Sequence, residues 1–565
     1  MSDAGDGLTR RRFLEMVGAA GGVAAVYETM TALGWAGRSA AYEGPPEIPA
    51  GNGKSVVVLG AGVGGLTAGW ELAKHGFAVT VLEAAARSGG RSFTVRSGDA
   101  IVEQAPGCER SEQVCRFADE PELYLNAGPG RLPYHHRAVL GVCRELGVEL
   151  EIYVMETTAD LFQTDGAFGG EAMPNRRVAN DTRGYLAEML AKAVNANFFD
   201  ADLSAAERGE LLGLLRVFGV LDAEYRYTDP ARSGYVVEPG VITRGVPVDK
   251  LPFGELLRAG FWNDRFYQPL DYEWQATLFQ PVGGMDHVWR AVEKALVGLG
   301  GRVLHGQAAV RIDNGEGGVT VAAVDPVSGE RSEHRADYCV SNVPLPHLAR
   351  IIAGDPTFSD DFVAAVSSVT WADTCKVGWQ TERRFWEEDD WIYGGISWID
   401  DVITQMWYPS NGYFGRRGVL TGAYNFTSRA RRFGNLDLAA RLDVAFRGAQ
   451  RLHPRFADDV DKDLGLSIAW QNVPHLNGGW ADWQPDQVRE YRRLLRPDNR
   501  VWVCGDQVSY LPGWQEGAIL SAHHVVKQIG ETAAGRVSAT LATALDRLET
   551  APETRRLVDG FRLPE

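Results

Sequence analysis

The sequence predicts a mixed fold of the α/β and α+β classes, in which a Rossmann-like nucleotide-binding domain is interleaved with a mixed-sheet domain and a helical insertion. Three observations predict it. Residues 55–84 follow the order strand, glycine turn, helix, strand; apolar residues at helical spacing dominate residues 132–257; and strand patterns return after residue 300 and recur up to an apolar run at residues 500–506. A chain of 565 residues is also too long for one simple core, so we expect several units that fold together.

The first element of the folded body is a βαβ unit, which follows a Pro- and Gly-rich linker at residues 45–54. The motif Gly60-x-Gly62-x-x-Gly65 stands between the first apolar run and a helical pattern, and Glu83 ends the second apolar run. Glycines at these positions let a pyrophosphate approach a helix N-terminus, and the acid can bond a ribose hydroxyl. A glycine turn without a ligand is the alternative, but the order of strand, turn, helix and acid favours a nucleotide site.

The later elements follow the same two periodicities. The stretch HRAVLGVCRELG has helical spacing, and Ser204 and Glu207 form a capping box before another apolar helix pattern. Strand patterns occupy GGRVLHGQAAVRI, EHRADYCVSNV and the tryptophan-rich residues 367–480, and the last strand, RVWVCGD, precedes a helix near Gly517. We therefore divide the chain into a leader and linker (1–53), a nucleotide-binding domain in three parts (54–131, 271–345 and 495–530), a helical domain (132–270), a substrate-binding domain (346–494) and a C-terminal helical tail (531–565).

Composition argues against several function classes. The net charge of -17 argues against a nucleic-acid partner, because phosphate binding needs a basic footprint. No segment from Lys54 onward offers the roughly 18 unbroken apolar residues of a membrane span, so no stable span is expected. The six cysteines follow no metal-ligand spacing, and we predict no metal site. Buried thiols are expected, with a Cys108–Cys115 disulfide after export as the alternative.

The N-terminus carries an export pattern. Residues 9–14 read TRRRFL, the twin-arginine pattern, and a short apolar run follows at residues 16–27. The twin-arginine translocation machinery carries folded proteins, which suits one that acquires a cofactor in the cytoplasm. We therefore expect an exported protein, periplasmic or secreted; an amphipathic first helix in a cytoplasmic protein is the alternative. The sites near Ala36 and Ala41 are poor cleavage signals, so removal of the leader stays open.

The string EAAARSGGR at residues 83–91 resembles the flavin amine oxidase family, in which the last arginine, here Arg91, faces the phosphates of FAD. The resemblance extends over about residues 55–527. Residues 280–288 are similar to the family's return strand, turn and helix, and Val310 matches the residue whose backbone meets the adenine. The resemblance thus implies FAD as the cofactor.

The stretch VCGDQVSYLPGWQEGA matches the family's C-terminal flavin motif. The resemblance implies that Asp506, in place of the more usual glutamate, bonds the ribityl chain, and that Gly513, Trp514, Gln515 and Ala518 border the flavin ring. Members with covalent FAD carry a cysteine just before the substrate-side aromatic residue, where this chain reads NVPHLNGGW, so non-covalent FAD is implied. The residues implied to bind FAD are Gly60, Gly62, Val63, Gly64, Gly65, Glu83, Ala84, Arg91, Gly128, Pro129, Gly130, Arg131, Val310, Trp470, Asp506, Gly513, Trp514, Gln515, Gly517 and Ala518.

The resemblance is closest to FAD-dependent L-amino acid oxidases, because GPGRLP matches their Gly-Pro-x-Arg segment, whose arginine binds the substrate carboxylate. Arg131 takes this place, and a planar guanidinium can form two parallel charge-assisted bonds with a carboxylate. Tyr408 in QMWYPS matches the tyrosine that donates to the same carboxylate, whereas Trp407 is expected to pack. The alternatives are a structural ion pair or phosphate contact for Arg131 and a core position for Tyr408.

Further substrate-side residues follow from the resemblance. Lys376 stands where the family keeps a lysine bonded through water to flavin N5, with a solvated strand lysine as the alternative. Trp470 is implied to pack on the flavin. Trp480 and Trp514 are implied to wall the side-chain pocket, which favours a large aromatic, apolar or basic substrate.

The resemblance therefore implies an L-amino acid oxidase, which converts an L-amino acid and O2 to a 2-oxo acid, ammonia and hydrogen peroxide. Arg131 and Tyr408 would hold the carboxylate, with the amino group near the backbone of Gly513. The alternatives are a monooxygenase that yields an amide, a primary or polyamine oxidase of the same fold, and a flavoprotein without turnover. His135 and His136 are expected at a helix end, with a role in proton transfer left open. The amino acid and the oligomeric state stay open, with a homodimer as one alternative.

Overall fold

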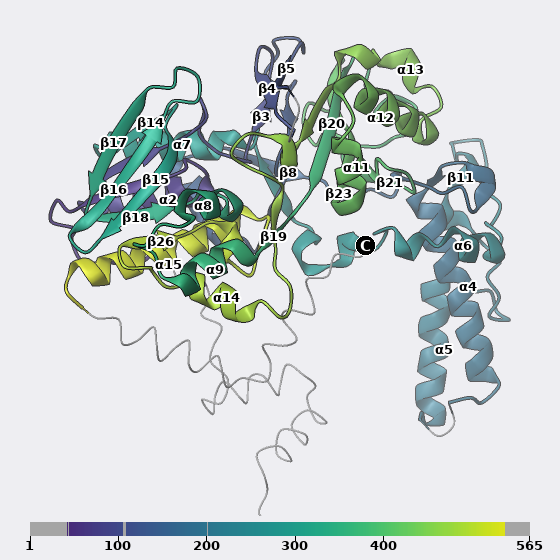
Figure 1. Ribbon diagram of the computed structural model, residues 1–565. Coiled ribbons are helices and arrows are strands. Elements are labelled where there is room, and N and C mark those ends of the chain that lie inside the picture. Colours follow the sequence, from purple (N-terminus) through teal and green to yellow (C-terminus); the bar gives the residue numbers. More distant parts are fainter. Residues whose placement is uncertain (1–41, 43, 106–108, 200–201, 537–565) are drawn as a thin grey trace, which may run out of the picture. The chain divides into compact units, whose positions relative to one another are not determined.

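The computed structural model describes residues 42, 44–105, 109–199 and 202–536 (Figure 1). The chain divides into two compact units, Met1–Pro45 and Pro46–Glu565, and every described helix and strand belongs to the second. The expected export signal, Cys108 and residues 537–565 lie outside the described residues. The domain boundaries expected within the second unit stay predictions, because that unit does not divide further.

A parallel sheet of five strands carries the first βαβ unit. In order across the sheet, the strands are β14 (Arg302–Leu304), β2 (Ala78–Leu82), β1 (Ser55–Leu59), β18 (Tyr338–Ser341) and β26 (Val501–Val503), and all neighbours run parallel. The central strands β1 and β18 are almost completely buried, which explains their unbroken apolar sequences. The strands come from separate stretches of the chain, as the predicted interleaved fold requires.

Helices cover one face of the parallel sheet and a small antiparallel sheet covers the other. Helix α2 (Val63–Lys74) lies over Val79 and Val81 and packs against α7 (Asp286–Gly298) and α15 (Gln515–Ala533). On the opposite face the alternate side chains of β1 pack with a three-stranded meander. The meander strands are β15 (Ala308–Gly315), β16 (Gly318–Val324) and β17 (Arg331–Ala336).

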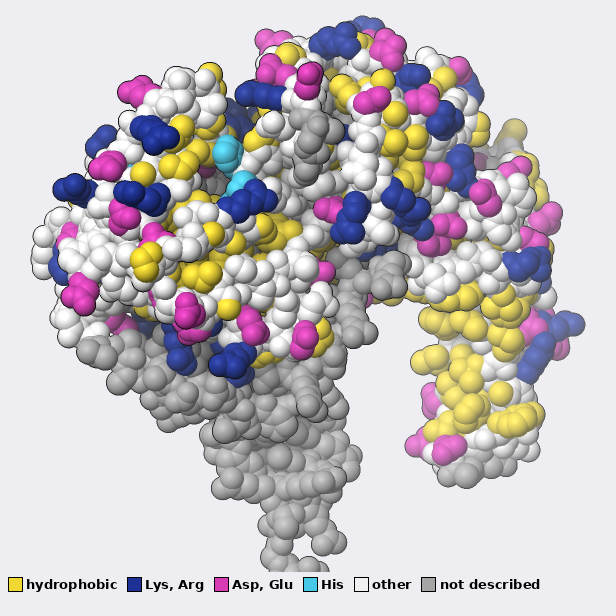
Figure 2. Space-filling view, in the orientation of Figure 1, with side chains coloured by type: hydrophobic (Ala, Val, Ile, Leu, Met, Phe, Trp, Pro, Cys, Tyr) yellow, Lys and Arg dark blue, Asp and Glu magenta, His cyan; other side chains and the backbone are white. Residues whose placement is uncertain are grey.

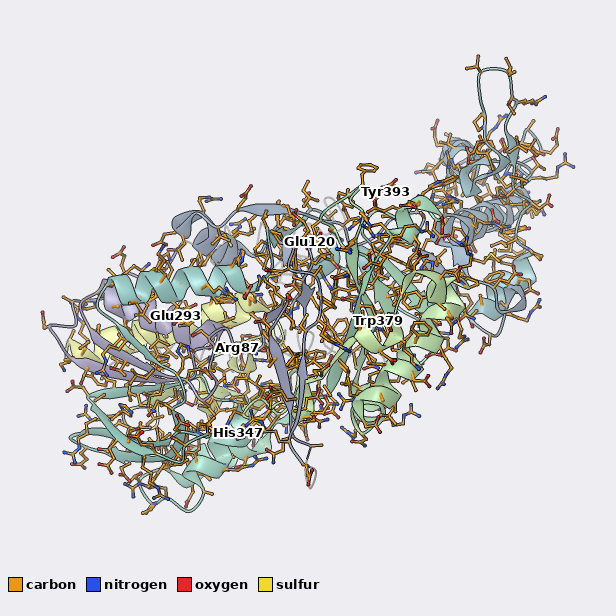
Figure 3. The ribbon with its side chains drawn as sticks, turned by 90° about the horizontal axis from the view of Figure 1, so that it is seen from above. Arg87, Glu120, Glu293, His347, Trp379 and Tyr393 are labelled. Atoms are coloured by element: carbon orange, nitrogen blue, oxygen red, sulfur yellow. The ribbon has the colours of Figure 1, made fainter. Side chains whose placement is uncertain are left out.

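A mixed sheet of seven strands forms the second large layer. In order across the sheet, the strands are β10 (Met173–Pro174), β9 (Leu161–Gln163), β21 (Ile396–Ile399), β22 (Gln405–Trp407), β23 (Gly418–Phe426), β20 (Thr374–Thr381) and β24 (Leu466–Ala469). The pair β9 and β21 is parallel, and the other neighbours are antiparallel. Helix α12 (Leu438–Leu452) packs on this sheet over a core that includes Trp379, labelled in Figure 3.

Two long helices form the hairpin within the predicted helical domain: α4 (Asn175–Asn195) and α5 (Ala205–Gly219). The predicted capping box is confirmed, because Ser204 Oγ accepts from the Glu207 N–H at 3.3 Å and the Glu207 carboxylate accepts from the Ser204 N–H at 2.8 Å. Apolar side chains, among them Leu214 and Val217, stay exposed on the hairpin (Figure 2).

A three-stranded sheet holds the chain just after Arg131. In it β13 (Leu278–Pro281) pairs with β7 (Leu132–Pro133) and β8 (Leu150–Tyr153), and α3 (Arg137–Leu146) lies between the last two in sequence. Within the described residues, no helix combines the length and the apolar character that a membrane crossing needs. The shorter α-helices are α6 (Phe253–Ala259), α8 (Leu345–Ile352), α9 (Asp360–Ser368), α10 (Phe385–Glu388), α11 (Thr427–Gly434), α13 (Phe456–Asp459) and α14 (Val488–Leu494).

Candidate active site

A cavity of about 490 Å³ lies along the carboxyl edge of the parallel sheet and reaches the mixed sheet. In Figure 3, Arg87 and His347, which both line it, lie among the elements of the parallel-sheet part, whereas Trp379 lies in the mixed-sheet part. A cleft at the carboxyl ends of parallel strands is the usual place for a nucleotide. The predicted site residues that line the cavity are Gly60, Gly62, Val63, Gly64, Glu83, Ala84, Arg91, Gly128, Pro129, Val310, Trp470, Trp480, Asp506, Gly513, Trp514, Gln515 and Ala518.

The glycine turn before α2 is closely packed against neighbouring backbone and Asn342. Gly60 has a φ of +92°, which glycine adopts readily. A Cβ on Gly65 would collide with the carbonyl oxygen of Gly60, and one on Gly62 would lie 2.7 Å from Asn342 Nδ2. Asn342 follows β18 and lines the cavity, and sequence reasoning missed it. The sequence feature that could have identified Asn342 is its position at the carboxyl end of an apolar strand.

Glu83 lies at the end of β2, on the cavity wall. Its carboxylate accepts from the N–H groups of Ala61 at 2.7 Å and Ala85 at 2.8 Å, so it also fixes the glycine turn. Burial raises the pKa of this carboxyl group, against the effect of the two N–H donors. Each carboxylate oxygen has a further lone pair, so a ribose hydroxyl can still donate to it.

Arg91 and Asp506 form an ion pair on the cavity wall. The guanidinium of Arg91 donates to both carboxylate oxygens of Asp506 and to the carbonyl of Gly479, while Asp506 accepts from the Gly513 N–H at 2.8 Å. The resemblance assigned Arg91 and Asp506 to different parts of the nucleotide. In the structure they join the C-terminal motif to the glycine before Trp480.

Arg131 lies beside the cavity with no acidic partner among the described residues. Its guanidinium carbon lies 4.9 Å from the ring centre of Trp407 and 5.8 Å from that of Trp514, and its Nε is enclosed without a hydrogen bond. Burial lowers the pKa of Arg131, an effect that Tyr153 and Tyr424 partly offset. Arg131 is half-buried, and a partly buried guanidinium without a counter-charge is costly, so this position favours an anionic ligand.

Lys376 lies behind the same segment and is 1% exposed. Its Nζ donates to the carbonyls of Asn126 at 3.0 Å and Gly128 at 2.6 Å, so it fixes the backbone that leads to Arg131. Burial and the nearby charge of Arg131 hold the pKa of Lys376 well below its usual range. Its expected water bridge to a flavin stays a prediction, whereas the alternative of a solvated strand lysine is wrong.

The structure does not bring Tyr408 to the cavity, which corrects the prediction for this residue. Its ring is 1% exposed, and its hydroxyl forms hydrogen bonds of 2.7 Å with Ser397 Oγ and with His453 Nε2. Trp407, expected to pack, is the neighbour that faces Arg131. Successive strand residues point to opposite faces, so one position decides between cavity and core.

Tyr424 is the tyrosine that the structure places at the cavity, and sequence reasoning missed it. It lies on β23, lines the cavity and interacts electrostatically with Arg131. Burial raises the pKa of its hydroxyl, so this group stays protonated and can donate a hydrogen bond. Its sequence, LTGAYNF, offered no signal beyond a tyrosine on a strand.

The other predicted residues fall on the wall or just behind it. Trp470 lines the cavity and donates from Nε1 to the Ala127 carbonyl at 2.9 Å, and Trp480 and Trp514 line the cavity as well. Three predicted glycines lie behind the wall: Gly65 in α2, Gly130 against the ring of Trp407, and Gly517 in α15.

His135 and His136 precede α3, as expected for a helix end. His136 Nε2 lies 3.0 Å from Glu273, His135 Nε2 lies 3.7 Å from it, and the ring of His136 meets Trp514 edge-on. These three residues are the one group of potential metal ligands among the described residues. The hydrogen bond between His136 and Glu273 explains why these side chains lie close together.

The five described cysteines are buried and free, as expected for thiols. Burial raises the pKa of Cys115 to about 11 and that of Cys143 to about 12. The alternative pairing of Cys115 with Cys108 lies outside the described residues, since Cys108 is not among them.

The comparisons with known proteins identify one family, whose profile covers most of the chain. The profile of the family described as "Flavin containing amine oxidoreductase" matches residues 63–530. The chain is 25% identical over 494 residues to the L-amino-acid oxidase of Echis ocellatus, a match that covers 85% of this chain and 90% of that protein. It is 26% identical over 518 residues to the L-amino-acid oxidase of Sistrurus catenatus edwardsii, which covers 86% and 89% of the two chains.

A solved structure of similar fold is that of a mutant putrescine oxidase. Its TM-score against this chain is 0.56 at 18% sequence identity, and the match covers 84% of this chain and 98% of that one. At this identity the likeness concerns the fold alone, and it supports the predicted arrangement of a nucleotide-binding part with a mixed-sheet part.

The cavity has a feature that a flavin would satisfy. Gln515 begins α15 on the cavity wall, and neither Oε1 nor Nε2 of its buried amide has a hydrogen-bond partner. A flavin ring carries N–H and carbonyl groups along one edge, which can pair with such an amide and with the N–H groups at a helix start. The residues at this end therefore fit the cofactor of the family.

Proposed function

The chain belongs to the family of flavin-containing amine oxidoreductases, and we propose that it is an FAD-dependent L-amino acid oxidase. It would convert an L-amino acid and O2 to a 2-oxo acid, ammonia and hydrogen peroxide. The observation that carries this proposal is the half-buried guanidinium of Arg131, whose Nε is enclosed without a hydrogen bond and which has no acidic partner among the described residues. An amino acid brings the carboxylate that this position lacks, whereas a simple amine does not. The names of the relatives are in keeping with the proposal.

Arg131 and Tyr424 would hold the carboxylate together. The guanidinium would form two parallel charge-assisted bonds, and the protonated hydroxyl of Tyr424 would donate a further one. Lys376 would hold the backbone of this segment in place through the carbonyls of Asn126 and Gly128. Tyr424 thereby takes the role that the sequence had suggested for Tyr408.

We propose FAD, bound without a covalent link, as the flavin. When bound, FAD supplies the two-electron acceptor for the oxidation of the substrate Cα–N bond. Gly479 stands just before Trp480, where family members with covalent flavin carry a cysteine, and it offers no side chain for attachment. The glycine turn, Glu83 and Gln515 would hold the cofactor, and Trp470, Trp480 and Trp514 would keep water from the reacting atoms.

One assay on the wild-type protein tests the proposal. The twenty L-amino acids and several primary amines and polyamines are offered with O2, and peroxide, ammonia and the organic product are measured. We expect peroxide and a 2-oxo acid from at least one L-amino acid. An amide product would indicate the monooxygenase instead, and turnover of amines alone would indicate an amine oxidase. The absence of turnover with every compound would leave a flavoprotein without this activity.

We also propose export by the twin-arginine translocation machinery, on the TRRRFL stretch of residues 9–14. Lysine replacement of Arg10 and Arg11, the two arginines of the Arg-Arg-x-Phe-Leu order, should leave the protein in the cytoplasm of its host with its flavin. Secretion of that variant at the wild-type level would disprove the route.

A further inference from the structure

Arg265 carries a second half-buried guanidinium, just behind the aromatic wall of the cavity. It lies between two short 3-10 turns, Phe261–Asn263 and Gln268–Leu270, and its guanidinium carbon is 4.6 Å from the ring centre of Phe426. Phe426 packs in turn against Tyr424, at 4.4 Å between ring centres, and Trp480, at 5.8 Å. Tyr424 and Trp480 line the cavity, whereas Phe426 and Arg265 are not among its lining residues, so Arg265 stands just behind this aromatic wall.

The guanidinium of Arg265 forms no hydrogen bond and no ion pair with any residue that the structure describes. It is half-buried, and burial lowers the pKa of its guanidinium. The carboxyl group of its neighbour Asp264 interacts with Asp400 and Arg429 instead. By contrast, two fully buried arginines are paired: Arg441 forms an ion pair with Glu103 at 2.8 Å, and Arg384 forms one with Glu387 at 2.6 Å.

The backbone at Arg265 is also unusual. Its φ is +59°, in the left-handed region that residues other than glycine rarely adopt. Strained residues of this kind concentrate at functional sites, where the surrounding structure holds them in place. Here the constraint turns an unpaired cation toward the aromatic wall.

Tyr424 lies within the electrostatic reach of both unpaired arginines. The charges of Arg131 and of Arg265 each oppose the rise in the pKa of its hydroxyl that burial causes. A substrate held at Arg131 beside Tyr424 would therefore feel a second positive charge, that of Arg265. The molecule that satisfies both guanidinium groups is an amino acid with a second carboxylate on its side chain.

We propose that Arg265 binds the side-chain carboxylate of an acidic L-amino acid, so that L-glutamate or L-aspartate is the preferred substrate. This inference rests on the proposed oxidase function. A charge-assisted bond to Arg265 selects for the acidic side chain. The same charge repels lysine and arginine, which disfavours the basic substrates that the tryptophan walls had suggested.

Kinetics of Arg265→Leu test the proposal. The ratio of kcat/KM for L-glutamate or L-aspartate to that for L-leucine should fall at least about thirtyfold, as for a lost hydrogen bond between charged groups. Arg429→Leu is the matched control. Arg429 is near Arg265 but pairs with Asp400 at 3.2 Å and donates to the Asp401 carbonyl at 2.9 Å, so its removal should leave the ratio unchanged. A ratio that falls equally in both variants would overturn the proposal.

Inhibition of the wild-type protein gives a measurement that does not depend on a variant folding. Glutarate carries two carboxylates and pentanoate one on a carbon chain of the same length, so glutarate should inhibit the oxidation of any accepted L-amino acid at least about tenfold more strongly. Equal inhibition would overturn the role of Arg265. If the wild type oxidises neutral amino acids but neither acidic one, this inference fails while the proposed function holds. If it oxidises amines alone, the proposed function fails as well.

Discussion

The two ends of the cavity are built in different ways. At the nucleotide end, the turn from Gly60 to Gly65 offers mainly backbone to a ligand, and Glu83 braces it through two N–H groups. At the proposed substrate end, single side chains from distant parts of the chain form the site: Trp480 and Tyr424 line the cavity, and Arg131 lies beside it. A site built from backbone groups should be damaged more by an added side chain than by a deleted one. A site built from side chains should be damaged more by a deletion.

The largest expected effect is at the substrate end. Arg131→Leu removes two bonds to the substrate carboxylate, each of about 1.5 to 3 kcal/mol net, so kcat/KM for L-amino acids should fall at least about a hundredfold. The fall should be much smaller for amines with the same side chain. Flavin content, measured by absorbance, should stay near the wild-type value.

Two results would contradict this view of Arg131. Equal losses for amino acids and amines would mean that the arginine serves the fold rather than the carboxylate. A variant without flavin would mean that it serves the cofactor. Either result would also remove the contrast between the two ends of the cavity.

The same contrast explains how far the sequence could be interpreted. The nucleotide end follows from about thirty consecutive residues, because a glycine turn between a strand and a helix can adopt few geometries. The substrate end depends on strand register, which local sequence does not determine. Trp407 and Tyr408 are adjacent in QMWYPS, and only the packing of β22 decides that Trp407 faces Arg131 while Tyr408 enters the core.

Contacts between residues that lie far apart in the sequence could not be predicted either. Arg265, from the predicted helical domain, meets Phe426 at the end of β23, and no motif links the two. Lys376 could be placed on a strand by its alternation, but its burial and its bonds to Asn126 and Gly128 follow from tertiary structure alone. The family resemblance found Arg131 because a local motif surrounds it, and it misplaced the tyrosine because none does.

At the nucleotide end, an added methyl group should be the damaging change. Gly65→Ala would place a Cβ against the carbonyl oxygen of Gly60, which is backbone and cannot move aside. Overpacking of this kind costs about 1 to 3 kcal/mol, so the dissociation constant of FAD should rise about tenfold or more. Gly213→Ala on α5 is the matched control, because no atom lies within 4 Å of its added carbon. Unchanged flavin affinity in Gly65→Ala would place the nucleotide elsewhere.

Substitutions of Tyr424 and Tyr408 test which tyrosine belongs to the cavity and which belongs to the core. Tyr424→Phe should lower kcat/KM for L-amino acids about tenfold, through one lost hydrogen bond to a carboxylate, with unchanged thermal stability. Tyr408→Phe should leave kcat/KM unchanged and lower the free energy of unfolding by about 1 to 2 kcal/mol, because Ser397 and His453 lose a buried partner. The reverse pattern, with activity lost in Tyr408→Phe, would restore the role first suggested for Tyr408.

The smallest effect is expected for a side chain deleted at the nucleotide end. Glu83→Ala removes an acceptor for a ribose hydroxyl, worth about 1 kcal/mol net, and the acceptor of the Ala61 and Ala85 N–H groups, which water in the space left by the side chain would replace. The dissociation constant of FAD should therefore rise only about fivefold in equilibrium titrations of the apoprotein. The pyrophosphate would still meet the N–H groups of the glycine turn and the start of α2. Burial raises the pKa of the Glu83 carboxyl group, which means that its ionised form is less stable there than at an exposed site. Complete loss of FAD from Glu83→Ala would show that this end depends on one side chain as strongly as the substrate end depends on Arg131, and that the backbone alone does not hold the cofactor.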